Sequence, residues 1–189
     1  MAINTLYLDN GILKSARNIY NRQNPKNIKL DNFFQKPVFE LLQKKLNNQK
    51  YALKFHPYKY KYGAAKLKEI NAFVNGMYFK DLIKSILQFK KYKITYEVRK
   101  FEAGNYTLLH DAEKEKYGID FFIDFSKDKK NFGGYAVYLN EKEELLALNT
   151  HPNSLSFIQR KKGVIKFTKY VIHRQKNPIV QVVGTIFKQ

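Results

Sequence analysis

The 189-residue sequence contains no cysteine, so disulfides, thiolate zinc sites and thiol nucleophiles are all excluded. No apolar run approaches the roughly 20 residues of a membrane span, and the N-terminus lacks the basic and apolar regions of a secretory signal. Phosphate-binding loops of the GxxxxGK or GxGxxG kind are missing, as is a nucleophile-elbow pattern. We therefore expect an intracellular protein, and nucleotide-binding or hydrolase functions have little support.

The residues that are present fit a folded domain. Hydrophobic residues make up 44% of the chain and aromatic residues 15%, which argues against disorder, and a chain of this length can bury a substantial core. We expect a partly ordered N-terminal arm over residues 1–30 and a single domain over residues 31–189. Within that domain we expect a helical support layer at 31–95 and a β-structure at 96–189.

Apolar residues recur at helical spacing in three segments of the N-terminal half. The spacing predicts helices over residues 32–47, with Asp31 as the N-cap, and over residues 64–74 and 78–89. We expect the Tyr-rich segment 51–62 to link the first two helices.

The C-terminal half consists of short apolar segments separated by Gly, Pro, Asn and Lys-Asp turns, which is typical of an antiparallel sandwich or barrel. Asp120 and Asp124 share one face of a strand with Phe122. They could point inward as ligands, but such residues on a half-buried strand more often face solvent. The predicted strands are residues 96–101, 118–125, 135–139, 155–159, 164–171 and 179–187.

Several segments of this half resemble, in content and order, the prolyl-hydroxylase-like branch of the 2-oxoglutarate- and Fe(II)-dependent oxygenases. They are residues 101–111 with His110-Asp111, 119–125, 132–139 with Gly133-Gly134, 152–157 with Pro152-Asn153, and 180–184. The resemblance implies an α+β fold, in which N-terminal helices support a double-stranded β-helix, a jelly-roll or cupin-like barrel.

The chemistry of that family needs two His and one carboxylate around iron, and the resemblance makes His110 the first ligand. The family's carboxylate position is Ala112, so Asp111 is the substitute, although it should point to the other side of an extended strand. The distal His position falls at Lys169, whose ammonium would repel iron. His173 shares its strand parity and could replace it after a register slip. The implied Fe(II) ligands are therefore His110, Asp111 and His173.

The resemblance also implies a basic residue that grips the 2-oxoglutarate carboxylate. It should lie five positions before Gly184, where this chain has Ile179. The candidate cofactor-binding residues are instead Arg174, Lys169 and Tyr106, with Lys166 as a further substitute. No catalytic residue beyond the metal ligands is assigned.

The formal net charge is +19, from 35 Lys and Arg against 16 Asp and Glu. Such a field attracts polyanions, of which nucleic acid is the usual one, and lysines interleaved with tyrosines could bind phosphates and stack on bases. A bias toward codons for Lys, Asn, Ile, Tyr and Phe would give the same charge without a site. The candidate nucleic-acid-binding residues are Lys59, Tyr60, Lys61, Tyr62, Lys90 and Lys91.

Three functions stay open. The first is an Fe(II)- and 2-oxoglutarate-dependent hydroxylase with an atypical metal site, acting on protein or nucleic acid. The second is a barrel of the same descent that has lost iron, with Lys169 in the old metal site, and that binds nucleic acid or protein through a lysine-rich surface. The third is a basic structural protein. The departures at Ala112, Lys169 and Ile179 favour the second on chemical grounds, whereas the resemblance itself favours the first.

Overall fold

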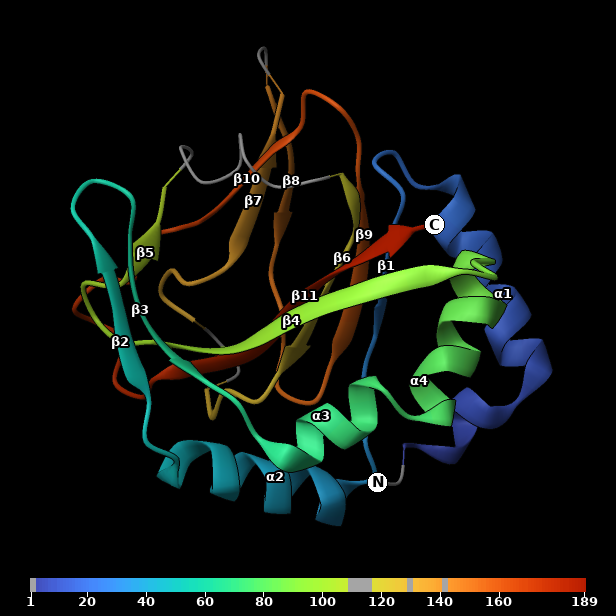
Figure 1. Cartoon of the computed structure of the whole chain (residues 1–189), viewed down its shortest axis with the longest axis horizontal. Helices are drawn as coiled ribbons and strands as arrows, with labels where there is room; N and C mark the ends of the chain where they lie inside the picture. Colours follow the sequence, from blue (N-terminus) through green and yellow to red (C-terminus); the bar gives the residue numbers. More distant parts are fainter. Residues whose placement is uncertain (1–2, 109–116, 129–130, 141–142) are drawn as a thin grey trace.

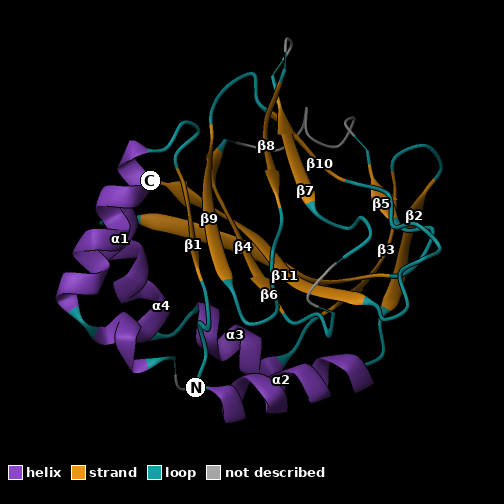
Figure 2. Ribbon diagram, turned by 180° about the vertical axis from the view of Figure 1, so that it is seen from behind, coloured by secondary structure: helices purple, strands orange, loops and turns teal. Residues whose placement is uncertain are grey.

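The computed structural model describes residues 3–108, 117–128, 131–140 and 143–189. Over these residues, one antiparallel sheet of eleven strands curls into a barrel, and the helices cover one of its outer faces (Figures 1 and 2). This confirms the expected α+β barrel with support helices. None of the described helices is long and apolar enough to cross a membrane.

The N-terminal half supplies the helices and the first three strands. In chain order these are the 3-10 turn η1 Thr5–Leu8, α1 Asn10–Arg22, β1 Asn27–Leu30, α2 Lys36–Asn48, β2 Ala52–His56, β3 Tyr60–Ala65, α3 Lys68–Val74, α4 Met77–Leu82 and the π-helical turn η2 Ile83–Leu87.

The C-terminal half supplies the rest of the barrel, whose strands follow the order β1-β9-β6-β11-β4-β3-β5-β10-β7-β8, with β2 paired to β3. Strand β8 was not predicted, because its first residue, Glu144, belongs to an acidic stretch that suggested a turn. The strands are β4 Tyr92–Phe101, β5 Tyr106–Thr107, β6 Gly118–Asp124, β7 Ala136–Leu139, β8 Glu144–Leu148, β9 Leu155–Arg160, β10 Ile165–Thr168 and β11 Ile179–Lys188.

The first 30 residues differ from the expectation of a partly ordered arm. Helix α1 is capped by Asp9, whose Oδ1 accepts a hydrogen bond from the Ile12 amide at 2.9 Å. Its inward residues Leu13 and Tyr20 are buried in the main core, and β1 pairs with β9. The many Asn and Lys residues in this segment lie on the solvent side of an amphipathic helix, which hid the helical pattern.

Two other boundaries differ from the predictions for physical reasons. Helix α2 begins at Lys36 instead of residue 32, because Pro37 fits the first turn of a helix and Asn32 adopts a left-handed φ of 50°. The segment 51–62 is not a linker between helices. It contains β2 and the first half of β3, which form a hairpin, since its polar and apolar residues alternate with the period of a strand.

The Pro152-Asn153 turn fastens the N-terminal segment to the barrel. Asn153 adopts a φ of 62°, a left-handed conformation that Asn tolerates. Its side-chain oxygen accepts from the Phe34 amide at 2.8 Å, and its side-chain nitrogen donates to the Phe34 carbonyl at 2.9 Å. This two-way pairing gives the motif a structural role that does not depend on iron.

Two glycines that carry the family resemblance lie where other parts of the chain approach the backbone too closely for a Cβ atom. Gly133 has a φ of +98°, and a Cβ there would lie 2.0 Å from the Tyr170 carbonyl oxygen. A Cβ on Gly184 would lie 2.3 Å from the Phe121 ring. Both positions therefore require glycine for packing.

The two faces of the curled sheet bury different kinds of residue. The face toward the helices is apolar and joins α1, α2, α3 and α4 in one core. The inner face of the barrel carries a smaller apolar cluster that includes Phe122, Tyr138 and Val183, together with buried charged and hydroxyl side chains. The candidate site lies on this inner face.

Candidate functional site

A buried carboxylate, Asp120 on β6, organises the middle of the barrel interior. Its Oδ2 accepts a hydrogen bond from Arg160 Nε at 3.1 Å and lies 3.3 Å from Lys166 Nζ, while its Oδ1 accepts from Thr185 Oγ1 at 2.7 Å. Burial alone would raise the pKa of Asp120, but the positive charges of Lys166 and Arg160 outweigh it and hold the pKa below its ordinary value. Asp120 is therefore an ionised group paired with two cations.

The expectation that Asp120 and Asp124 face solvent is wrong. Both residues are completely buried, because β6 lies between β9 and β11 and both of its faces are covered. Strand parity was predicted correctly, since both aspartates do share the inner face with Phe122. Strand parity alone could not predict that the sheet closes over that face and buries both aspartates.

A second charged group lies nearer the barrel mouth, on β4 and the β2–β3 hairpin. Glu97 Oε2 accepts hydrogen bonds from Arg99 Nε and from the Tyr62 hydroxyl, both at 3.1 Å, and Lys54 pairs with Oε1. Burial would raise the pKa of Glu97, but the Lys54 hydrogen bond and the Arg99 charge lower it below its ordinary value. The Arg99 guanidinium carbon also lies 4.7 Å from the centroid of the Tyr62 ring, a cation–π contact.

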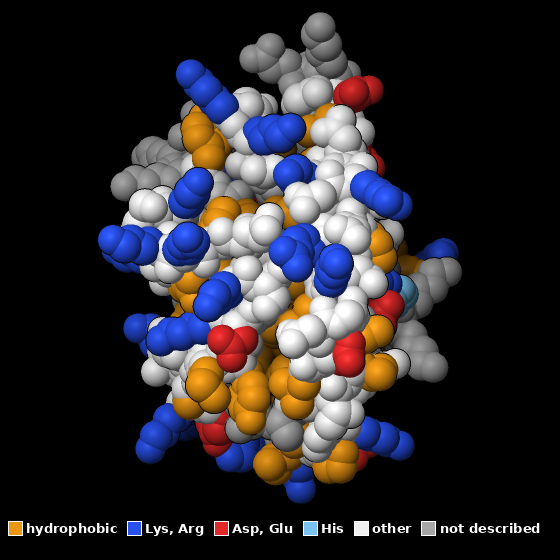
Figure 3. Space-filling view, turned by 90° about the vertical axis from the view of Figure 1, so that its right-hand side faces the viewer, with side chains coloured by type: hydrophobic (Ala, Val, Ile, Leu, Met, Phe, Trp, Pro, Cys, Tyr) orange, Lys and Arg blue, Asp and Glu red, His pale blue; other side chains and the backbone are white. Residues whose placement is uncertain are grey.

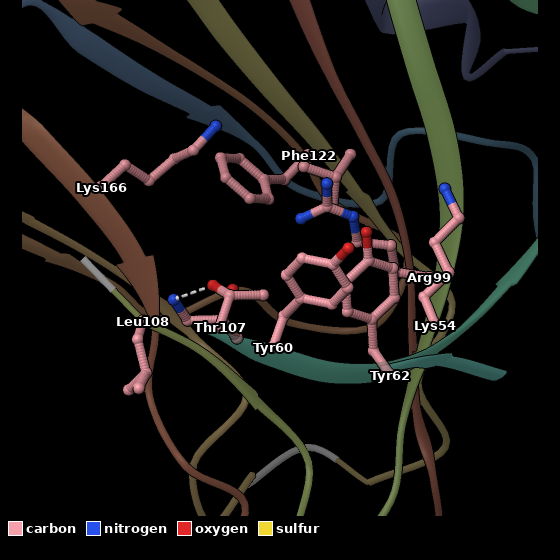
Figure 4. A pocket seen from close by; sticks show the side chains of 10 residues that line it. Lys54, Tyr60, Tyr62, Arg99, Thr107, Leu108, Phe122 and Lys166 are labelled. Carbon is pink, nitrogen blue, oxygen red and sulfur yellow. Dashed lines mark hydrogen bonds between the residues drawn. The ribbon is translucent and has the colours of Figure 1, made fainter. Parts of the chain in front are cut away.

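Between these two groups the barrel encloses a cavity of about 160 Å³. Figure 4 shows the Arg99 guanidinium reaching into it, with Lys166 on the opposite wall and the rings of Tyr60 and Tyr62 beside it. Within the described ranges, the charged side chains that line the cavity are all cationic, and aromatic rings form much of the rest. The lining residues include Lys54, Tyr60, Tyr62, Arg99, Phe122 and Lys166.

The other inward aspartate, Asp124, has only neutral neighbours. Its Oδ1 accepts from the Ser126 amide at 2.7 Å, its Oδ2 is hydrogen-bonded to Thr150, and Gln181 donates to the Thr150 hydroxyl at 2.9 Å. Burial raises the pKa of Asp124 above its ordinary value, although the hydrogen bonds from Ser126 and Thr150 offset part of the effect.

The structure describes only some of the residues predicted to bind iron and 2-oxoglutarate. His110 and Asp111 lie outside the described residues. His173 and Arg174 are exposed in the turn after β10, and Tyr106 stacks on Tyr170 with ring centroids 6.3 Å apart.

Lys169 is also exposed and does not line the cavity. Its ammonium lies over the Tyr135 ring, 5.4 Å from the centroid, and a hydrogen bond with Tyr135 raises the pKa of Lys169. Within β10, Lys166 and Thr168 are the inward residues, so strand parity excludes Lys169 from the interior. The lysine inside the barrel is Lys166.

The position expected to grip 2-oxoglutarate is part of the apolar core. Ile179 is fully buried and packs in a cluster with Tyr62, Phe101 and Val171. An aliphatic side chain offers a carboxylate no hydrogen bond. The signal that could have located Arg99 is the polar run Thr95, Glu97, Arg99 on a single strand face, which indicates a polar barrel interior.

The candidate nucleic-acid residues do not form one surface. Tyr62 is buried and Tyr60 half-buried on the inner face of β3, so neither ring is open for base stacking. Lys90 and Lys91 precede β4, whose far end meets the hairpin, so they lie at the opposite end of the molecule from Lys59 and Lys61 (Figure 1). Figure 3 shows Lys and Arg spread over a whole face, with uncharged and apolar side chains between them.

The described residues alone do not supply a set of iron ligands, and the predicted ligands His110 and Asp111 lie outside them. Fe(II) in such sites needs His and carboxylate donors with open positions, and no three His, Asp or Glu side chains come together among the residues the structure describes. The inward carboxylates are already engaged, Asp120 by two cations and Asp124 by hydroxyl and amide donors.

The chain matches the model of a known protein family. The family described as oxoglutarate and iron-dependent oxygenase degradation C-term matches residues 53–187, well over half of the chain. The chain belongs to this family. The match begins at the β2–β3 hairpin and extends to β11, so it includes every strand that lines the cavity.

Curated relatives of this family member match only over part of their length. The chain is 34% identical over 82 residues to prolyl 3-hydroxylase OGFOD1 of Mus musculus, covering 41% of this chain and 15% of that protein. It is 28% identical over 86 residues to the protein of the same name in Xenopus laevis, covering 42% of this chain and 17% of that protein. The chain therefore corresponds to a small part of those proteins.

Solved structures confirm the fold. An oxidoreductase of the 2OG-Fe(II) oxygenase family from Burkholderia pseudomallei has a TM-score of 0.67 at 8% identity, covering 94% of this chain and 90% of that one. A prolyl-4-hydroxylase from Pseudomonas putida also has a TM-score of 0.67, at 7% identity, covering 94% of this chain and 100% of that one. At such identities the likeness shows the double-stranded β-helix alone.

Proposed function

We propose that this domain uses the oxygenase fold as an iron-independent binding module for an anionic segment of a partner protein. One observation carries the proposal: among the residues that the structure describes, the charged side chains that line the barrel cavity, Lys54, Arg99 and Lys166, are all cationic. A cavity lined in this way opposes Fe²⁺ and favours an anion. The apolar surroundings of Ile179 support the same conclusion, since they provide no anchor for 2-oxoglutarate.

A protein partner is favoured over nucleic acid by where the aromatic side chains lie. Tyr60 and Tyr62 line the cavity instead of an open surface, and a cavity of about 160 Å³ is smaller than the roughly 300 Å³ at the low end for drug-sized ligands. A single acidic side chain suits this space better than a stacked base. A prolyl hydroxylase of the same fold from Trichoplax adhaerens, with a TM-score of 0.59, was solved with a peptide fragment bound.

The second candidate is an Fe(II)- and 2-oxoglutarate-dependent hydroxylase, and membership of an oxygenase family favours it. In that case His110 and Asp111 would hold the iron, with His173 as the third ligand. His173 would then have to leave its exposed turn after β10.

Anaerobic titration of the protein with Fe(II) and 2-oxoglutarate separates the two candidates. Chelated 2-oxoglutarate gives a metal-to-ligand charge-transfer absorbance. We expect no saturable band, no thermal shift from either ligand, and the same result for His110→Ala. A saturable band that His110→Ala abolishes would overturn the binding-module proposal and establish the hydroxylase.

A further inference from the structure

We infer that the barrel cavity is a binding site for a tetrahedral oxyanion: phosphate, either free or as a monoester on a partner's side chain. The inference rests on the proposed function and names the anion that the module recognises.

Arg99 is the central group of this site. Its Nε donates to Glu97, which fixes the plane of the guanidinium, and the Tyr62 ring supports one face of that plane. No acceptor among the described residues occupies the two terminal nitrogens, and Figure 4 shows the guanidinium inside the cavity. A guanidinium held in this way presents a pair of parallel donors, the geometry that binds phosphate oxygens in a bidentate manner.

The charge around Arg99 favours an anion even after the internal ion pairs are counted. Glu97 is ionised, since the pKa of its carboxyl is lowered, but it contacts both Arg99 and Lys54. Counting the described residues, one carboxylate facing two cations leaves an excess of one positive charge at the mouth. Lys166 adds a positive charge on the opposite wall of the cavity while it pairs with Asp120. Neither Glu97 nor Asp120 is among the described residues that line the cavity.

The direction of the donors favours a tetrahedral anion over a planar carboxylate. Lys54 comes from β2 and Arg99 from β4, which both pair with β3, whereas Lys166 comes from β10 on the opposite wall of the cavity (Figure 4). The cavity also contains the Tyr60 side chain, whose hydroxyl can donate. A phosphate group offers oxygens in four directions to such a set, whereas a carboxylate offers two in one plane.

The test measures binding of inorganic phosphate to the whole chain by isothermal titration calorimetry, at low salt and in a buffer without competing anions. We expect one site per chain with a dissociation constant of about 1 mM or lower. Arg99→Gln should weaken binding roughly tenfold or more, because the bidentate donor pair is lost. Lys54→Gln should weaken it by a smaller factor, because Lys54 is half exposed and shares Glu97.

Lys93→Gln is the matched control. Lys93 lies on the same strand and has the same strand parity as Arg99, but it is exposed and pairs with Phe187 at the far end of β4. This variant removes the same formal charge from the molecule, so binding should stay within about twofold of the parent if the site, and not the overall +19 field, is responsible. Circular dichroism and a thermal melt of each variant exclude unfolding as the cause of a loss.

A further arm identifies the source of the phosphate. A short peptide with one phosphoserine is compared with its unphosphorylated form and with inorganic phosphate. Tighter binding of the phosphopeptide alone assigns the site to a modified partner protein, and equal binding of phosphopeptide and phosphate assigns it to the free ion; either result supports the site. Absence of saturable phosphate binding, or equal losses in Arg99→Gln and Lys93→Gln, would refute it.

Failure of the phosphate site can be told apart from failure of the proposed function. If the domain is a hydroxylase, the anaerobic titration gives a charge-transfer band whether or not phosphate binds. If it is an iron-independent module that recognises a different anion, neither the band nor phosphate binding appears.

Discussion

Asp120 and Asp124 lie four residues apart on the same inner face of one strand, and both are fully buried, yet their surroundings are opposite. Asp120 contacts the cations Arg160 and Lys166, which lower its pKa. Asp124 contacts hydroxyl and amide donors only, and burial raises its pKa. Equal burial is therefore accompanied by pKa shifts in opposite directions, because the neighbouring charges decide whether the pKa of a buried carboxyl rises or falls.

The same difference distinguishes the end of the barrel that contains the cavity from the end that contacts the support helices. Lys166 contacts Asp120 and lines the cavity, so the ionised aspartate holds a cation at the cavity wall. Near Asp124, the backbone carbonyl accepts from the Asn153 amide at 2.9 Å and Ser126 accepts from Gln43 of α2 at 2.8 Å. The Asp124 end of β6 therefore joins the barrel to its support helices through hydrogen bonds between neutral groups.

The largest expected effect is that of Asp120→Asn. The substitution removes the carboxylate from a buried Arg160 and should lower the free energy of unfolding by about 3–5 kcal/mol at pH 7, the usual cost of breaking a buried ion pair. Urea denaturation measures the loss. Asp31→Asn is the control, because Asp31 forms an exposed pair with Lys29 at 3.5 Å, and it should cost no more than about 1 kcal/mol.

The loss of unfolding free energy caused by Asp120→Asn, its stability deficit, should also depend on pH. The pKa of Asp120 is lowered in the folded state, so its stabilisation is present above the unfolded pKa of about 3.9 and is lost as the pH falls through the folded value. The deficit should therefore shrink on acidification. A deficit that stays constant from pH 7 to acid pH would show that the substitution acts through packing, not through charge.

A smaller loss is expected for Thr185→Val, which keeps the shape of the side chain and removes one donor. The Thr185 hydroxyl donates to Asp120 at 2.7 Å, and a hydrogen bond to a charged group contributes about 1.5–3 kcal/mol. Thr95→Val is the matched control, because Thr95 pairs with Thr185 across β4 and β11 but is exposed. Equal losses for both variants, measured by thermal denaturation, would mean that the hydroxyl adds nothing to the Asp120 group.

Much of the barrel could be predicted from sequence because its strands are short, apolar and separated by turn residues. The glycines and the Pro152-Asn153 turn were informative for the same reason, since Gly133 and Asn153 adopt left-handed backbone conformations that few residues accept. The β2–β3 hairpin was missed although Tyr60, Tyr62 and Ala64 alternate with Lys61 and Gly63, because the Tyr-rich composition suggested a loop.

The interior of the barrel could not be predicted from any single segment. Asp120 meets Arg160 40 residues away and Thr185 65 residues away, and such partners are set by strand order, which local patterns do not give. The resemblance put Lys169 at the metal site, but its strand parity is opposite to that of the inward residues Lys166 and Thr168, so it lies outside the barrel. Arg99 was not predicted as a site residue, because its orientation depends on contacts with both Glu97 and Tyr62.

Asp124→Asn should change the free energy of unfolding least, and it should raise that free energy where the other substitutions lower it. The pKa of Asp124 is raised in the folded state, so the stability contributed by its neutral form is complete below the unfolded pKa of about 3.9 and is lost as the pH rises through the folded value. A neutral amide avoids that loss, and it can still accept a hydrogen bond from the Ser126 amide and donate one to the Thr150 hydroxyl. We expect a gain of roughly 1 kcal/mol at pH 7, measured by urea denaturation, that shrinks toward pH 4. A loss at pH 7 as large as that of Asp120→Asn would mean that Asp124 is held as a paired anion, and the contrast between the two ends of β6 would then be wrong.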